Sequence, residues 1–229
     1  MFRVFIVITF LFASLEQLNA QSKVSYDFKK GQVLDIMLIT NKPDIEALFA
    51  NYKKTAFPVA MKLGYQPQPG FGIAEYTQGN QQPASFIFGK WNSLEKREQF
   101  LTDITKSVPD FHEQRRSMFE LFALTYYEMQ EDISFEIDRE KLVVVTAYWQ
   151  QEASTFQSFT KAWLKTAKRS GGEIILELTD GKSPFAYYYQ PDYLVITQWN
   201  DREEFNKFYS KNLKMEQEGL RHVNQFILK

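Results

Sequence analysis

The sequence predicts an α+β protein built from two copies of one strand-and-helix unit, and three observations support this. The string at residues 24–30 is echoed about 109 residues later at 133–139, each before a polar turn. Matching strand, helix and turn signals then follow in the same order in both halves. The first long apolar runs, 33–39 and 142–148, are apolar on both faces. A repeat this long predicts a duplicated domain that forms a pseudo-dimer within one chain.

The first half begins with an alternating strand at residues 24–28, and the turn at 29–32 leads into the strand at 33–39. A helix is predicted from about Asp44, with apolar residues spaced for one buried face and Gly64 as its stop. Pro58 lies inside this pattern and is expected to kink or split the helix.

A second core strand pattern, at residues 86–88 and again at 193–196, runs into a Trp-Asn pair in each half and then into a polar helix. The residues after each Trp are good helix caps, which gives the pair a structural reason to recur. The second half repeats the first helix and ends it at Gly171 and Gly172. The polar connection before Ile133 places the boundary, giving one repeat at 21–130 and another at 131–229.

The doubly apolar strands at 33–39 and 142–148 need cover on both faces. Helices of the same repeat can cover one face. The simplest cover for the other face is the sheet of the sister repeat, so the two sheets are expected to pack against each other.

Residues 1–20 have the features of a cleaved signal peptide: a short positive start, an apolar run at 4–13 and a cleavage site before Gln21. The alternative is a membrane anchor, but the apolar run is well short of the ~20 residues that span a bilayer. We therefore expect an exported protein, periplasmic or secreted, without a membrane span after signal removal.

The composition limits the chemistry. The chain has no cysteine, which excludes disulfides and thiolate metal sites, and its 21 Phe, 12 Tyr and 4 Trp are ample for packed cores. A net charge of −1 gives no sign of a nucleic-acid partner. No Ser-His-Asp order and no His-Glu-x-x-His motif is present, so no metal site is predicted and enzymatic activity is left open.

The run at residues 191–200, with Gly171, Gly172, Phe205 and Phe208, carries a family resemblance. It resembles the ferredoxin-like domains of the dimeric α+β barrel superfamily, in the antibiotic-biosynthesis-monooxygenase-like group, and is most similar to a bacterial domain of unknown function. The resemblance implies two tandem ferredoxin-like repeats, each βαββαβ with an extra N-terminal strand, packed sheet to sheet as an intramolecular barrel.

Haem-degrading members of this superfamily use an Asn on the first strand, an aromatic residue in the second helix and a His near the end of that helix. Asp35, Phe100 and His112 stand near those positions, and the second half keeps Phe208 and His222 but has apolar residues for the Asn. These departures leave no cofactor as the main expectation and haem as the alternative.

Several residues are candidates for a functional site, and each of them also has a purely structural interpretation. Asp35 interrupts an apolar strand and is either a catalytic base or the partner of a nearby cation. His112 and His222 are acid-base groups, haem ligands or solvated loop residues. Glu75 and Glu177 recur in matching strands, and glutamates at such positions are often simply exposed to solvent. The cluster Tyr187, Tyr188 and Tyr189 lies in a hairpin longer than its counterpart, and it either lines a pocket or is strand.

The leading hypothesis is an exported barrel protein of unknown activity that binds a small apolar or aromatic molecule or serves a structural role. The alternative is a cofactor-independent monooxygenase or a haem-binding or haem-degrading enzyme. A third hypothesis is an adaptor that pairs with a partner protein through the extra N-terminal strands. Because the repeats differ at Asp35, in the tyrosine hairpin and around the histidines, any site is expected to be single and asymmetric.

Overall fold

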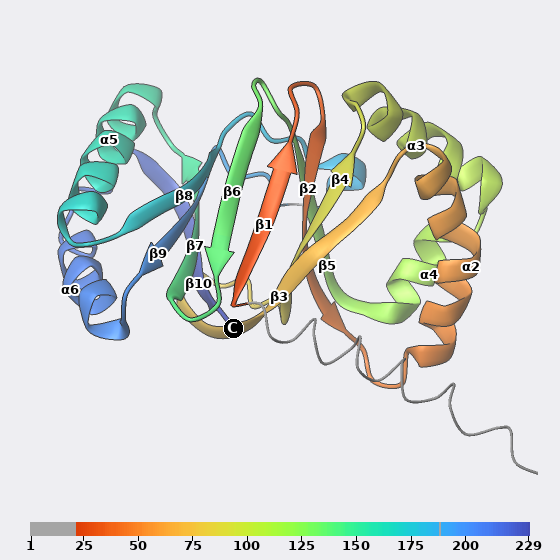
Figure 1. Cartoon of the computed structure of the whole chain (residues 1–229), viewed down its shortest axis with the longest axis horizontal. Helices are drawn as coiled ribbons and strands as arrows, with labels where there is room; N and C mark the ends of the chain where they lie inside the picture. Colours follow the sequence, from red (N-terminus) through yellow and green to blue (C-terminus); the bar gives the residue numbers. More distant parts are fainter. Residues whose placement is uncertain (1–21, 188) are drawn as a thin grey trace, which may run out of the picture.

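The computed structural model describes residues 22–187 and 189–229, so the expected signal peptide at 1–20 lies outside the described part. Its strands and long helices follow one order that occurs twice, with α4 added in the first half and a 3₁₀ turn in the second (Figure 1). In chain order they are β1 (Lys23–Phe28), β2 (Val33–Asn41), α2 (Glu46–Lys62), β3 (Gln66–Gln78), β4 (Ser85–Trp91), α3 (Leu94–Ser107), α4 (Phe111–Met118), β5 (Phe119–Glu128), β6 (Ile133–Asp138), β7 (Leu142–Gln150), α5 (Ala153–Arg169), β8 (Glu173–Leu178), the 3₁₀ turn η1 (Pro184–Ala186), β9 (Tyr193–Trp199), α6 (Arg202–Asn212) and β10 (Leu220–Leu228).

Eight strands form one antiparallel sheet in the order β5-β2-β4-β3-β10-β7-β9-β8. Repeat 1 (β1 to β5) supplies the first four and repeat 2 (β6 to β10) the last four, each in ferredoxin-like order. The repeats join along β3 and β10, from Gln78 opposite Gln225 to Ile73 opposite Leu228. At the other seam an isolated bridge joins Tyr126 and Lys182 through two backbone hydrogen bonds of 2.9 Å. This arrangement confirms the predicted pseudo-dimeric α+β barrel.

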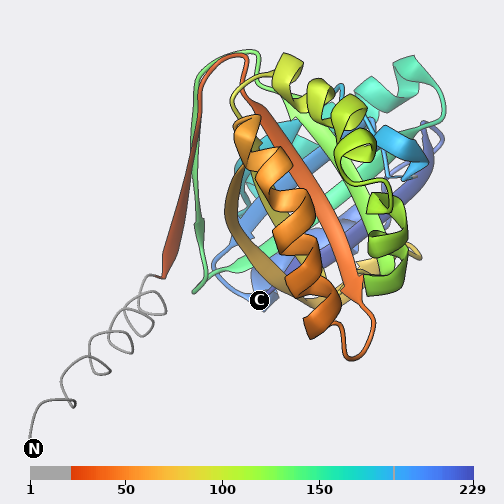
Figure 2. The ribbon, with the colours of Figure 1, turned by 90° about the vertical axis from the view of Figure 1, so that its right-hand side faces the viewer.

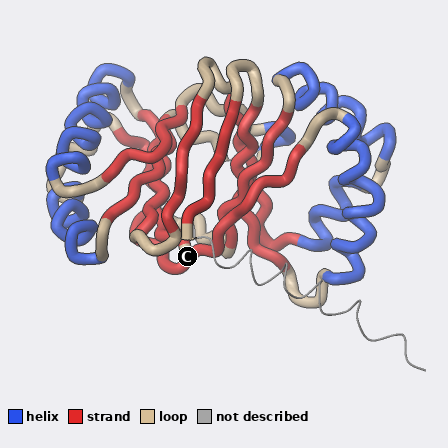
Figure 3. Tube along the Cα trace, in the orientation of Figure 1, coloured by secondary structure: helices blue, strands red, loops and turns tan. Residues whose placement is uncertain are grey.

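The helices lie outside the barrel, with α5 and α6 over the strands of repeat 2 and α2, α3 and α4 over those of repeat 1 (Figures 1 and 3). Along β2, Leu34, Ile36 and Leu38 face the barrel interior, whereas Val33 packs with the helices. Side chains from both repeats fill the interior, including Phe86 of β4 and Phe226 of β10. The two faces of the doubly apolar strands are therefore buried by different partners.

The extra strands β1 and β6 pair with each other, from Lys23 opposite Asp138 to Phe28 opposite Ile133. The resulting ribbon lies in front of the barrel in Figure 1 and along one side of it in Figure 2. Its buried face packs on the core, with the Tyr26 ring 4.8 Å from that of Phe88 in β4. Because β6 occupies one edge of β1, that edge is not free for the partner protein of the adaptor hypothesis.

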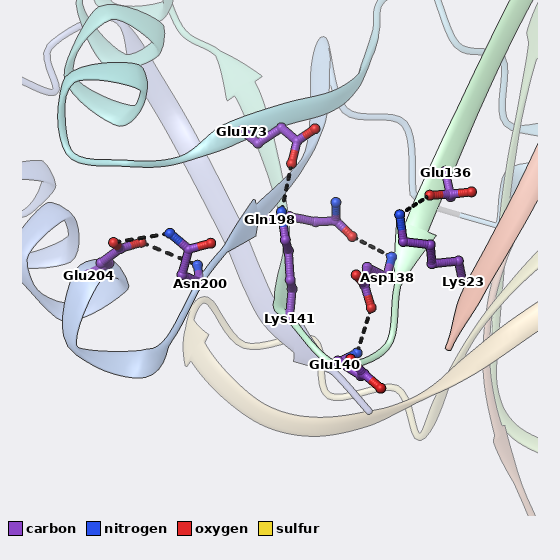
Figure 4. Close-up of polar contacts among 9 residues, drawn as sticks. All are labelled: Lys23, Glu136, Asp138, Glu140, Lys141, Glu173, Gln198, Asn200 and Glu204. Carbon is purple, nitrogen blue, oxygen red and sulfur yellow. Dashed lines mark hydrogen bonds and ion pairs between the residues drawn. The ribbon is translucent and has the colours of Figure 1, made fainter. Parts of the chain in front are cut away.

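Each repeat holds the ribbon from an equivalent position, namely the residue that precedes its recurring tryptophan, Trp91 or Trp199. In repeat 1, Lys90 Nζ donates to the carbonyl oxygen of Asp27 at 2.8 Å. In repeat 2, Gln198 Oε1 accepts from the backbone N–H of Asp138 at 2.5 Å (Figure 4). The ribbon therefore ties the two repeats together.

The local predictions were partly right. Gly64 and Gly171 end α2 and α5 with φ of 87° and 98°, in the left-handed region that favours glycine. Pro58 was predicted to kink or split its helix. It does not split the helix, because α2 is one continuous helix. Helix α4 was not predicted, and repeat 2 has no counterpart to it between α6 and β10. No helix within the described residues has the length and apolarity of a membrane span.

Candidate ligand-binding site

A pocket of about 210 Å³ lies in repeat 1 between the outer face of its sheet and helices α2, α3 and α4. Its walls are mainly aromatic and aliphatic, with Tyr52 and Ala56 from α2 and Phe122 from β5. The charged residues that line it are Asp35, Arg97 and Arg115. A mostly apolar pocket with a few convergent polar groups is the usual form of a small-molecule site.

The wall formed by β2 and α3 contains a buried ion pair. Arg97 Nε donates to Asp35 Oδ1 at 2.8 Å, and Trp91 Nε1 donates to Asp35 Oδ2 at 2.9 Å, so both carboxylate oxygens accept a bond. The two charged side chains are only 2% and 3% exposed. Arg97 Nη1 is buried with no hydrogen-bond partner among the described residues. An unmet buried donor costs roughly 1–3 kcal/mol, so this nitrogen favours an acceptor brought by a ligand.

A second guanidinium, that of Arg115 on α4, lies at another wall. Its Nε donates to the hydroxyl of Tyr52 at 3.0 Å, and its Nη1 donates to the hydroxyl of Tyr187 at 2.8 Å. The same guanidinium lies 4.2 Å from the centroids of both Phe111 and Phe122, which favours the cation over the ring faces. Tyr187 belongs to the β8–β9 connection, so repeat 2 reaches across to a residue of the repeat 1 pocket.

The phenol of Tyr65 also lines the pocket, and burial raises its pKa above the usual range. It is therefore a neutral hydroxyl at neutral pH. The ionised groups on the walls are then one carboxylate and two guanidiniums, which leaves a net positive charge of one.

Repeat 2 offers an internal comparison at the ion pair. Asp35 lies opposite Gly89 in the pairing of β2 with β4, and Val144 lies opposite Thr197 in the pairing of β7 with β9. Gly89 and Thr197 each stand two residues before the tryptophan that ends the strand, so Val144 corresponds to Asp35. The same count from the tryptophans matches Arg97 to Phe205. Repeat 2 thus packs two apolar side chains where repeat 1 has the charged pair.

The first helices differ in bulk at the same layer. Helices α2 and α5 are both 17 residues long, and each is followed at the same spacing by its positive-φ glycine, so Ala56 corresponds to Trp163. The Trp163 ring packs 5.3 Å from Phe208 and 6.0 Å from Tyr148 in the core of repeat 2. An indole therefore fills in repeat 2 the kind of space that the small Ala56 side chain leaves open in repeat 1.

Three of the residues singled out in the sequence meet at this pocket. Asp35 and Phe100 line it, and Tyr187 holds Arg115. Tyr189 instead lies in the barrel interior, and Phe208 belongs to the helix-covered core of repeat 2. Tyr188 falls outside the described residues.

The histidines lie apart from the pocket, and the loop interpretation of both was wrong, because His112 is in α4 and His222 is in β10. The His112 ring lies 4.6 Å from Phe185, and that of His222 lies 4.9 Å from Trp149. Burial lowers the pKa of both imidazoles, and neighbouring arginines lower it further.

The two glutamates are surface contacts of the barrel wall. Glu75 pairs with Arg202 across the β3–β10 seam, and Glu177 accepts a hydrogen bond from the Tyr193 hydroxyl at 2.7 Å. Neither residue lines the pocket of repeat 1. Sequence reasoning missed Arg97 and Arg115, although comparing the positions that follow each tryptophan would have shown a charge in one repeat only.

The pocket residues do not fit a haem. Haem iron is held by His, Cys, Met or Tyr side chains. Neither histidine lines the pocket; Met37, Tyr52 and Tyr65 do, but the Tyr52 hydroxyl already accepts from Arg115, and the small size of the pocket decides against the group. The volume of about 210 Å³ is close to that of cavities of about 150 Å³ that bind a benzene ring, so one or two rings fit better than a tetrapyrrole. Within residues 22–187 and 189–229, no group of three or more His, Cys, Asp or Glu side chains could hold a metal ion.

No family model and no curated protein sequence matches the chain. Among solved structures, an anthrone oxidase-like protein is 11% identical over 90% of this chain and 94% of its own, with a TM-score of 0.46. A putative monooxygenase from Fusobacterium nucleatum is 14% identical over 88% and 93%, with a TM-score of 0.40. A chlorite dismutase from Candidatus Nitrospira defluvii is 7% identical over 88% and 92%, with a TM-score of 0.47. Structural similarity at such low sequence identity says nothing about the activity of this chain.

Proposed function

We propose that this protein binds one small, flat and mainly apolar molecule of one or two rings in the pocket of repeat 1. The observation that carries the proposal is the aromatic-walled pocket with a buried ion pair in its wall and an unmet donor on Arg97. We also propose, from the features of residues 1–20, that the protein acts in the periplasm or outside the cell.

The duplication favours binding over a purely structural role. A buried ion pair is often no more stable than a well-packed apolar pair, and an open pocket forgoes packing contacts. Repeat 2 has apolar side chains at the corresponding positions, namely Val144, Phe205 and Trp163. Repeat 1 folds on the same plan yet keeps the charge and the space, which serves a ligand better than it serves the core.

The oxygenase alternative would need a base to deprotonate the bound ring. Asp35 is the carboxylate that lines the pocket, but its two oxygens already accept bonds from Arg97 and Trp91. The proposal is therefore binding without turnover, and oxygen uptake during titration with aromatic diols is the measurement that would contradict this part of it.

The test is to fill the pocket with the side chain that repeat 2 uses. The mature chain, residues 21–229, is titrated with naphthalene-2-carboxamide by calorimetry, and Ala56→Trp is expected to weaken binding at least tenfold because the indole occupies the space. The matched control is Ala50→Trp, which adds the same ring on the exposed side of α2 and should bind as the wild type does. Equal binding by Ala56→Trp, or binding by the wild type of neither this amide nor the matching carboxylate, would refute the proposed site.

A further inference from the structure

We infer that the ligand of this pocket carries a carboxylate, and that Arg97 binds it. The inference rests on the proposed function, since it names the chemistry of the molecule that the pocket of repeat 1 takes.

The charges on the pocket walls do not balance. Asp35 is committed to Arg97 Nε at 2.8 Å, and it is the lone carboxylate against two guanidiniums among the lining residues. Arg115 makes no salt bridge among the described residues, and its hydrogen-bond acceptors are the hydroxyls of Tyr52 and Tyr187. One positive charge in a largely apolar setting is left for a ligand to neutralise, and burial strengthens that attraction.

The donors on Arg97 point to the same chemistry. A guanidinium has five N–H donors in a planar fork, and Asp35 takes only the one on Nε. Nη1 has no partner although the side chain is 2% exposed. A second carboxylate is the natural acceptor for such a fork, and bonds between two charged groups are about twice as strong as neutral ones.

Structural need alone does not explain both cations. The bonds from Arg97 and Trp91 give each oxygen of the Asp35 carboxylate one donor, and the fork of Arg97 keeps further donors that Asp35 does not take. Arg115 contributes nothing to this pair, and it lies on α4, the helix that repeat 2 lacks. Repeat 2 has neither cation at its corresponding layer, where Phe205 replaces Arg97. Both positive charges are thus features of the repeat that has the pocket.

The experiment compares two ligands of nearly the same shape, naphthalene-2-carboxylate and naphthalene-2-carboxamide, by calorimetry at pH 7. The wild type should bind the carboxylate at least about tenfold more tightly. The double variant Asp35→Val with Arg97→Phe, which copies the residues of repeat 2, should lower the ratio of the two affinities, because the carboxylate keeps the charge of Arg115 and loses the fork of Arg97. Arg97→Lys should give an intermediate ratio, because the charge stays and the fork is lost. The control Arg116→Gln alters the neighbouring exposed arginine, which pairs with Glu113, and should keep the wild-type ratio.

Equal affinity of the wild type for the two probes would overturn the carboxylate assignment while leaving the proposed pocket intact. A carboxylate preference that is unchanged in the double variant would overturn the role of Arg97. Binding of neither probe by the wild type would overturn the proposed function and this inference together.

Discussion

Asp35 and Arg97 should stabilise the fold only as a pair, and the duplication supplies the variants that test this. Asp35→Val and Arg97→Phe each place in repeat 1 the side chain that repeat 2 has at the same position. Each single variant leaves the other charge buried, at 2% or 3% exposure, without its partner. The double variant removes both charges and replaces them by an apolar pair that this fold already packs once.

The expected free energies follow from these surroundings. Removing one partner of a buried pair costs about 3–5 kcal/mol, because the remaining charge is uncompensated. Replacing both by apolar groups is neutral or gains roughly 1–4 kcal/mol. Asp35→Val also takes the acceptor from Trp91 Nε1, a loss of about 1–3 kcal/mol, since Gly89 has no hydroxyl like that of Thr197. The free energy of unfolding of the double variant should therefore lie within about 2 kcal/mol of that of the wild type.

The assay is urea denaturation and thermal denaturation of the four proteins of the cycle, followed by tryptophan fluorescence and far-ultraviolet circular dichroism. Each single variant should lower the unfolding temperature by roughly 6–20 °C for a chain of this size, and the double variant by far less. The coupling energy should exceed about 2 kcal/mol. Single variants that lose less than 1 kcal/mol, or losses that simply add in the double variant, would refute the buried-pair interpretation.

Two further predictions concern a contact between the repeats and a helix cap. Tyr187→Phe removes the hydroxyl that accepts from Arg115 at 2.8 Å, so ligand affinity should fall several-fold. Tyr189→Phe removes a hydroxyl in the barrel interior that has no hydrogen-bond partner among the described residues, and it should leave affinity unchanged. Glu152 caps α5, and bonds from the backbone N–H groups of Thr155 and Ser154 lower its pKa from 4.5 to about 2. Because the folded-state pKa is lowered, the charged cap stabilises the protein above pH 4.5 and this contribution is lost as the pH falls toward 2. Glu152→Ala should therefore be less stable at pH 7 in urea denaturation, and the difference should shrink over that window; a difference that does not change with pH would contradict the role of the charge.

The fold followed from the sequence to a large extent because its determinants are local and occur twice. Alternation at residues 24–28, the doubly apolar run at 33–39 and the glycine stops at Gly64 and Gly171 each predict an element by themselves, and the duplication supplies a second reading of each. The need of a doubly apolar strand for cover on both faces then predicts two sheets facing each other. Helix α4 was missed because it is a polar segment of only 8 residues and has no counterpart in repeat 2.

The candidate site depended on distances that the sequence does not contain. Asp35 stood out in the sequence because a charge in an apolar strand is visible there, and the alternative of a cationic partner was open from the start. The identity of that partner was decided by the docking of α3 on β2 and β4, which brings Arg97 across 62 positions of chain. Likewise the contact of Tyr187 with Arg115 joins the two repeats, and only the closure of the barrel places those segments together. Sequence patterns determine which surfaces must be buried, whereas the packing of those surfaces determines which polar groups meet and where space is left.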